Sequence, residues 1–136
     1  MIRELTINTQ GQGLTEITRD VAAAVSDADF DQGLCTVFIC HTSASLTIQE
    51  NADPSARHDL EQWLNRLVPE DDPRFTHTAE GPDDMPSHIK AVLTTTSLSI
   101  PIAGGRLSLG SWQGIYLWEH RRGDHARKVV VHVLGE

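Results

Sequence analysis

The chain has 136 residues, a formal net charge of −8 and seven histidines. This length fits one domain over residues 1–136, and the acidic balance opposes duplex nucleic acid or an anionic membrane surface as the main partner. No run approaches the roughly 18 apolar residues of a membrane span, and the amino-terminal residues lack the apolar core of a signal peptide, so we expect a cytoplasmic protein with no membrane partner.

The first third of the chain predicts two strands around one helix. Residues 2–8 alternate apolar and polar side chains, which predicts a strand ending near Gly11. Thr15 is expected to cap a helix that runs to about Asp27, with a buried stripe of Ile17, Val21, Ala24 and Val25. The apolar, β-branched run 34–40 predicts a central strand that places His41 at its end.

The two cysteines, Cys35 and Cys40, both lie in this central run. Their odd spacing directs the side chains to opposite faces of the strand, which opposes a disulfide between them. Neither has the close CxxC partner of a structural zinc site, so we expect buried thiols.

The next segment predicts a strand followed by a helix. Residues 45–50 alternate again, and Asp53 before Pro54 is a strong helix start, with a capping carboxylate and a proline in the first turn. For Asp53, this capping role and a role in a binding site are equal alternatives. The helix is expected over residues 54–67, with one apolar face formed by Leu60, Trp63, Leu64 and Leu67.

Residues 77–90 hold the densest group of titratable side chains, including His77, Asp84, His88 and Lys90. Pro86 is suited to the first turn of a helix, which would place His88 and Lys90 beside backbone donors that favour an anion. The alternative is a polar surface loop that caps a helix.

The last third predicts strands. Residues 98–103 and 106–111 are expected to form a hairpin at Gly104–Gly105, and residues 115–120 and 128–134 two further strands joined by a polar turn over 121–127. Glu119 shares a face with two aliphatic residues, which places it either at a strand mouth or in an internal pair. His132 is more typical of a core or edge histidine than of a ligand.

Three histidines suggest a metal site or a general base. The imidazoles of His41, His77 and His88, with Glu119 or Asp84, could hold Mg²⁺ or Zn²⁺ and leave a position open. A histidine base oriented by an acid needs no metal. The chain lacks HExxH, GxSxG and P-loop motifs. An anion cradle could form at the helix start from Lys90, Arg106, Arg121 and Arg127.

Several motifs resemble, in order, the YjbQ family, which is described as a secondary thiamine-phosphate synthase group. They are His41-Thr42-Ser43-Ala44-Ser45, Glu50-Asn51-Ala52-Asp53-Pro54, His77 through Gly81, Asp83 through Lys90, and Leu109 through Gly114 with Glu119. One segment departs from the family pattern. Many relatives follow the glutamate with Phe-Asp-Gly-Pro-Arg, whereas here Glu119 precedes His120-Arg121-Arg122-Gly123-Asp124, which makes Arg127 the equivalent of the final arginine.

The resemblance implies a compact α+β fold, mostly an antiparallel sheet or sandwich with a few peripheral helices, that assembles as a homotrimer. It also implies a weak synthase activity that joins a hydroxymethylpyrimidine diphosphate to a thiazole phosphate and releases pyrophosphate. With the residue chemistry above, it assigns catalysis to His41, Asp84, His88 and Glu119. It assigns substrate binding to Asn51, Asp53, Lys90, Gln113 and Arg127, and metal ligation to His41, His77 and His88.

Two other functions stay open. A metal-dependent hydrolase would use the same three histidines as ligands and Glu119 as base or ligand. A trimeric regulatory module would bind a small phosphorylated or anionic metabolite without turnover. The sequence alone does not separate this module from the synthase.

Overall fold

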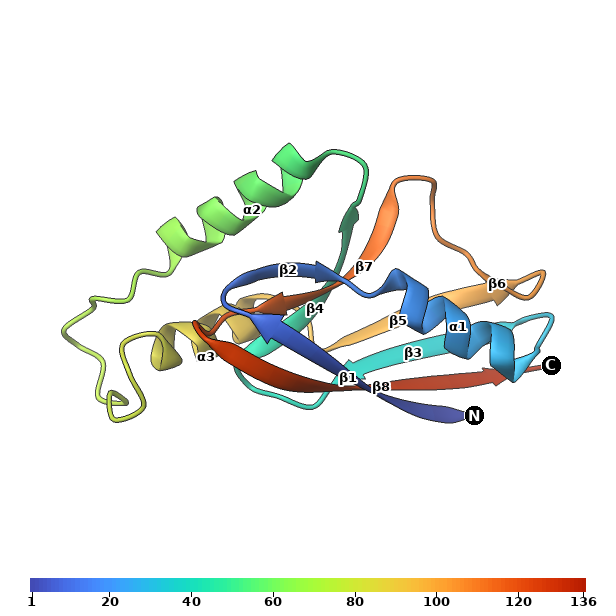
Figure 1. The fold of residues 1–136 in the computed structure, drawn as a ribbon, viewed down its shortest axis with the longest axis horizontal. Helices are drawn as coiled ribbons and strands as arrows, with labels where there is room; N and C mark the ends of the chain where they lie inside the picture. Colours follow the sequence, from blue (N-terminus) through green and yellow to red (C-terminus); the bar gives the residue numbers. More distant parts are fainter.

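A computed structural model describes residues 1–136, which form eight strands and three helices (Figure 1). The strands are β1 (Ile2–Gln10), β2 (Gly13–Glu16), β3 (Gly33–Ile39), β4 (Ala44–Glu50), β5 (Ser97–Ala103), β6 (Arg106–Leu107), β7 (Gln113–Glu119) and β8 (Asp124–Gly135). The helices are α1 (Thr18–Ala28), α2 (Pro54–Leu67) and α3 (Asp84–Leu93).

The strands form two antiparallel sheets. One has the order β1-β8-β3-β5-β6, and the other has the order β2-β7-β4. β3 is the middle strand of the larger sheet, as predicted, and β8 pairs with both β1 and β3. The predicted α+β class, mostly antiparallel with a few helices outside the sheets, is confirmed.

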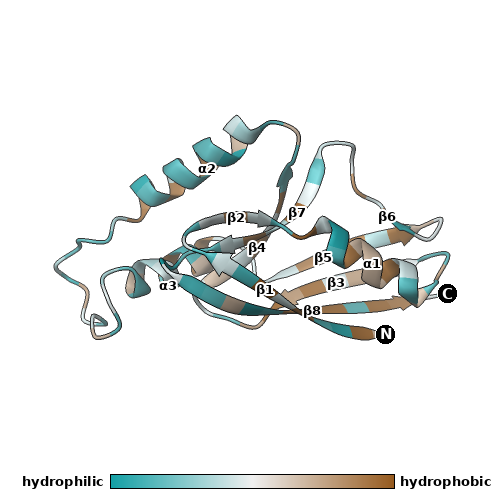
Figure 2. Ribbon diagram, in the orientation of Figure 1, coloured by the Kyte–Doolittle hydropathy of each residue, from teal (hydrophilic) through white to brown (hydrophobic).

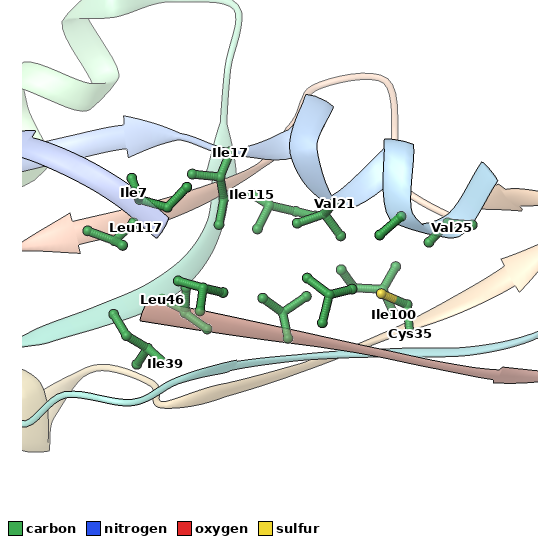
Figure 3. Packing of buried hydrophobic residues seen from close by; sticks show 14 of the residues in the cluster. Ile7, Ile17, Val21, Val25, Cys35, Ile39, Leu46, Ile100, Ile115 and Leu117 are labelled. Carbon is green, nitrogen blue, oxygen red and sulfur yellow. The ribbon is translucent and has the colours of Figure 1, made fainter. Parts of the chain in front are cut away.

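The main core lies between the inner face of the larger sheet and a layer made of α1 and the smaller sheet (Figure 3). Alternate residues of the central strands fill it, as the period of two requires. They include Cys35, Val37 and Ile39 of β3 and Val129, Val131 and Val133 of β8, all at most 1% exposed. Figure 2 shows the same division, with hydrophobic stretches on β3 and β5 and a mostly hydrophilic α2.

β7 is buried on both faces. Ile115 and Leu117 point into the main core, whereas Tyr116 and Trp118 pack in a second cluster with Leu64 of α2. Glu119 follows on the face of Ile115 and Leu117, so its carboxylate enters the protein interior at the end of the strand.

The first helix begins later than predicted. Residues 13–16 form β2, which pairs with β7, and α1 starts at Thr18 without a side-chain cap at Ile17. The predicted Thr15 cap is wrong, because the backbone N–H and C=O groups of this segment bond to β7 instead of forming a helical turn. The predicted buried stripe is confirmed, since Ile17, Val21, Ala24 and Val25 are all buried.

One buried face and two boundaries also differ from the prediction. In α2 only Leu64 of the expected face is buried, and Trp63 and Leu67 are 51% and 52% exposed. The second hairpin strand spans only Arg106–Leu107. β8 starts at Asp124 rather than at residue 128, because Asp124 pairs with Gln10 of β1.

The two cysteines differ in their surroundings. Cys35 is buried, and burial raises the pKa of its thiol to about 11. Cys40 is exposed, which corrects the expectation of two buried thiols. None of the three helices combines the length and the apolar character that a membrane-spanning helix requires.

Candidate functional site

Three of the predicted residues meet at the start of α3. The helix begins at Asp84, which places Asp84 and His88 one turn apart on the same face, and His77 approaches from the preceding loop. His77 Nε2 lies 2.6 Å and His88 Nε2 lies 3.1 Å from Asp84 Oδ2. One ligand atom from each residue lies within 4.8 Å of the others, so the three could share one ion.

The orientation of His88 follows from a backbone contact. Its Nδ1 lies 3.0 Å from the carbonyl oxygen of Thr42, which can only accept a hydrogen bond. Nδ1 therefore carries the proton, and in the neutral ring Nε2 presents a lone pair to Asp84 Oδ2. Two acceptors at 3.1 Å repel unless a cation, either a proton or a metal ion, lies with them.

Arg121 holds the carboxylate of this cluster. Its Nη1 lies 3.0 Å from Asp84 Oδ1, and its Nε donates to Asp83 Oδ2 at 3.1 Å. Burial opposes ionisation of Asp84, but the hydrogen bond with His77 and the charge of Arg121 help to outweigh it and lower the pKa. Oδ1 is thus occupied by Arg121, and Oδ2 faces the two imidazoles.

A hollow of about 310 Å³ adjoins the cluster, and His41 and His88 form part of its wall. The hydroxyl side chains around it are Thr42, Ser45, Thr94, Thr95 and Thr96. The remaining residues of the wall are Ala44, Ala91 and Val92. No aspartate, glutamate, lysine or arginine lines the hollow.

His41 does not join the His77–Asp84–His88 cluster. Its Nε2 accepts a hydrogen bond of 2.8 Å from the backbone N–H of Lys128, and the ring lines the hollow instead. Burial and the nearby charge of Arg127 lower the pKa of the imidazole. The structure therefore separates His41 from the two histidines with which the sequence grouped it.

Glu119 and Arg127 form an internal ion pair and do not line the hollow. Arg127 Nε donates to Glu119 Oε1 at 2.7 Å, and Thr9 Oγ1 donates to the same oxygen at 2.6 Å. Burial opposes ionisation of Glu119, but the hydrogen bonds from Arg127, Thr9 and the Arg121 amide lower the pKa. Of the two alternatives for Glu119, the structure has the internal pair.

Lys90 lies in the last turn of α3 rather than the first, because the helix begins before Pro86. Its Nζ is buried and donates to Asn65 Oδ1 at 2.7 Å, and burial lowers its pKa. His88 also lies beyond the first turn, so the expected anion cradle at the helix start is wrong. Arg121 and Arg127 are bound to carboxylates, and Arg106 is exposed on the β5–β6 hairpin.

The other predicted binding residues make local contacts outside the hollow. Asp53 caps α2 by accepting from the Ser55 amide at 2.9 Å. The Gln113 side chain accepts from the Gly110 amide at 2.7 Å, and Asn51 Nδ2 lies 3.5 Å from Glu16. Thr42 was missed because it acts through its backbone carbonyl, which leaves no signal in the sequence.

The comparisons with known proteins agree with the motif resemblance. The family model described as UPF0047 protein YjbQ-like matches residues 3–136. The chain belongs to the YjbQ family. It is similar to the UPF0047 protein sll1880 of Synechocystis sp., with 54% identity over 97% of this chain and 90% of the relative. The UPF0047 protein YjbQ of Escherichia coli O157:H7 is 41% identical over 98% of this chain and 97% of its own length.

Solved structures match the fold over nearly the whole chain. A conserved hypothetical protein from Thermus thermophilus has a TM-score of 0.87 and 38% identity, covering 97% of this chain and 99% of the other. A YjbQ/UPF0047 protein from Clostridium acetobutylicum has a TM-score of 0.89 and 37% identity with the same coverage. The descriptions of the matching family and relatives name no reaction. The chemistry of the site is therefore inferred from its geometry.

Proposed function

We propose that this protein is a divalent-metal-dependent hydrolase that acts on a small phosphorylated or otherwise anionic metabolite. The observation that supports this function is the His77–Asp84–His88 cluster, in which the Thr42 carbonyl orients His88 with its lone pair toward the carboxylate. Metal-binding histidines commonly donate their second ring N–H to a backbone carbonyl in this way.

The donor set fits some metals better than others. Two imidazole nitrogens and one carboxylate oxygen suit Zn²⁺ and other first-row ions, whereas Mg²⁺ prefers oxygen ligands and water. His77, Asp84 and His88 would hold the ion and leave positions open for a ligand. A bound ion would supply Lewis-acid polarisation of a phosphoryl oxygen.

The charges around the cluster favour a ligand whose anionic end lies beside the ion. Arg121 is committed to Asp83 and Asp84, and Lys90 is committed to Asn65. The ion would therefore be the main positive charge available to a phosphate group. In the hydrolysis, water adds to phosphorus, the P–O ester bond breaks and a proton passes to the departing oxygen, which yields an alcohol and inorganic phosphate.

Metal analysis of the purified protein tests this function, with p-nitrophenyl phosphate as the first substrate. We expect about one equivalent of Zn²⁺ per chain and zinc-dependent release of nitrophenol. Loss of a residue that only hydrogen-bonds to a metal ligand typically weakens metal binding by roughly 10- to 100-fold. Asp84→Asn and His88→Ala change ligands themselves, so we expect each to weaken zinc binding by more than this. His58→Ala, at an exposed position of α2, is the matched control. Unchanged zinc binding in both cluster variants would contradict the proposal.

The second candidate is the thiamine-phosphate synthase reaction that the motif resemblance implies. An ion at the cluster could neutralise a departing diphosphate, which is the specific feature that favours it. Glu119 is committed to Arg127, which removes it from both reactions, so hydrolysis is placed first because it requires only an ion, water and one substrate. Supplying both substrates with Mg²⁺, Mn²⁺ or Zn²⁺ tests this reaction, and product formation that persists in Asp84→Asn and His88→Ala would count against the cluster as its site.

The homotrimer, the cytoplasmic location and a binding role without turnover stay predictions. Val92, which lines the hollow, is 83% exposed and its neighbour Leu93 is 56% exposed, so a subunit boundary there would cover apolar surface beside the site. Light scattering measures the mass directly, and a mass near one subunit would contradict the trimer. Stabilisation by a metabolite in thermal-shift screening, without turnover, would favour the binding role.

A further inference from the structure

His41 is held in one protonation form by the backbone of β8. The Lys128 amide, which can only donate, lies 2.8 Å from His41 Nε2, so Nε2 must be the acceptor. A neutral imidazole that accepts at Nε2 carries its proton on Nδ1. His41 therefore presents a hydrogen-bond donor at Nδ1 and has no second lone pair with which to bind a metal.

This donor has no partner within the chain. Among polar side-chain atoms, only Arg57 Nε and His125 Nδ1 are both buried and without a hydrogen bond, so His41 Nδ1 is open to solvent or a ligand. His41 and His88 line the same hollow, and His88 also belongs to the metal-binding cluster. Because His88 belongs to both, a ligand in the hollow can reach the cluster and His41 together.

The wall of the hollow favours an uncharged ligand group. It carries hydroxyls and imidazoles over small apolar residues, which offer hydrogen bonds to ligand oxygens, and no charged side chain lines it to pair with a charged group. Its 310 Å³ corresponds to about ten water molecules at roughly 30 Å³ each, at the lower end of the usual range for small-molecule sites. A compact group that bears hydroxyl or carbonyl oxygens matches both properties.

We propose that the hollow binds the uncharged, oxygen-bearing part of the substrate, with His41 Nδ1–H donating to one of its oxygens. This inference rests on the proposed function, because the anionic end of the substrate lies at the His77–Asp84–His88 cluster. It narrows the substrate class to small phosphate esters of polyols and disfavours esters of amines or amino acids. His41 is then a residue that touches the substrate rather than a metal ligand.

Three phosphate esters of similar size test the selectivity on the zinc-loaded protein. Glycerol phosphate has a neutral body, phosphoethanolamine a cationic one and phosphoserine a zwitterionic one. We expect kcat/KM for glycerol phosphate to be at least about 10-fold above both others, since the hollow offers hydrogen-bond partners for hydroxyl groups and no charged partner for an ammonium or a carboxylate. Equal rates for the three esters, with p-nitrophenyl phosphate hydrolysed, would overturn this inference and leave the proposed function standing.

Two variants test the role of His41. His41→Ala removes the donor, whereas His41→Asn keeps an amide N–H close to the position of Nδ1. We expect KM for glycerol phosphate to rise about 10-fold in His41→Ala with a smaller change in kcat, to recover largely in His41→Asn, and zinc content to stay at the wild-type level in both. Loss of zinc in His41→Ala would make it a ligand and overturn the inference, as would an unchanged KM.

Imidazole ¹⁵N NMR tests the binding role of His41 independently of whether the protein is a hydrolase. The His41 ring should show the Nδ1–H form, and its Nδ1 signal should move on titration with glycerol phosphate whether or not the ester is hydrolysed. If zinc or turnover is absent but this shift occurs, the hydrolase proposal fails and the binding role of the hollow stands. An Nε2–H ring, or no shift at saturating ester, would overturn the role of His41.

Discussion

At the scale of single residues, Glu119 and Arg127 show how a buried charge pair is held. Both residues are at most 5% exposed. Besides Arg127, the Thr9 hydroxyl and the Arg121 amide also donate hydrogen bonds to the Glu119 carboxylate. Removing two charges from water costs several kcal/mol per ion, which only close geometry and additional hydrogen bonds offset. The pair links β7 to β8, and Thr9 links it to β1. Its net contribution to the free energy of folding is small, but removal of either partner leaves the other charge buried and unpaired.

Truncation of Glu119 should be strongly destabilising. Glu119→Ala leaves the Arg127 guanidinium buried without its carboxylate, and we expect the free energy of unfolding to fall by about 3–5 kcal/mol in urea denaturation. The double variant Glu119→Leu with Arg127→Met replaces both charges with apolar groups and should recover most of this loss. A single variant as stable as the wild type would show that Arg127 finds water or another partner.

Residues that are costly to bury could be recognised from the sequence, whereas most of their partners could not. Glu119 was recognised because it shares a face with Ile115 and Leu117, and that face does enter the core. Its pairing with Arg127 depends on the tight return from β7 into β8, which begins four residues earlier than predicted. His41 was grouped with His77 and His88 by residue type, whereas the Lys128 amide that directs its ring is a backbone group without a sequence signal.

At the scale of elements, local propensity succeeded where no neighbour competed with it. Asp53 and Pro54 predicted the start of α2, and Asp53 caps it. Thr15 was also predicted to cap a helix, but residues 13–16 pair with β7 as β2, which takes their backbone groups into the sheet. The start of α3 at Asp84 likewise follows tertiary contacts, since Arg121 and the two imidazoles surround that carboxylate.

The β5–β6 turn provides a prediction at this scale. Gly104 and Gly105 have φ of 58° and 74°, which suits a primed hairpin turn and disfavours side chains with a Cβ. A Cβ at Gly104 would meet nothing within 4 Å, so the cost of Gly104→Ala comes from the backbone alone. We expect a loss of about 1–2 kcal/mol in urea denaturation, and a smaller loss in Gly104→Asn, because asparagine tolerates this region better. Equal stability of Gly104→Ala and the wild type would show that the turn relaxes to another form.

At the scale of the whole molecule, the two-layered core forces polar groups of β7 into the interior. His120, directly after this strand, is 1% exposed, and its Nε2 lies 2.9 Å from the Ser45 hydroxyl. Burial, with the charge of Lys90, lowers the pKa of the ring from 6.5 to about 3. The native protein therefore keeps His120 neutral at pH values where the unfolded chain protonates it.

This difference predicts the pH dependence of stability. Between about pH 6.5 and pH 3 the unfolded chain binds one proton more than the native protein at His120, so stability falls as the pH falls through this window. The contribution to the slope approaches about 1.4 kcal/mol per pH unit below the ordinary pKa of histidine. His120→Gln keeps a polar partner for Ser45 without the titration, so its stability should change less between pH 6.5 and pH 4.5 in urea denaturation.

An exposed histidine supplies the control for this slope. His58→Ala should retain the wild-type pH dependence, because His58 is exposed and its removal leaves His120 in place. The lowered pKa values of Asp83, Asp84 and Glu119 also reduce stability as the pH falls, but these carboxylates remain in both variants. Identical slopes in His120→Gln and the wild type would therefore show that His120 accepts a proton in the folded protein.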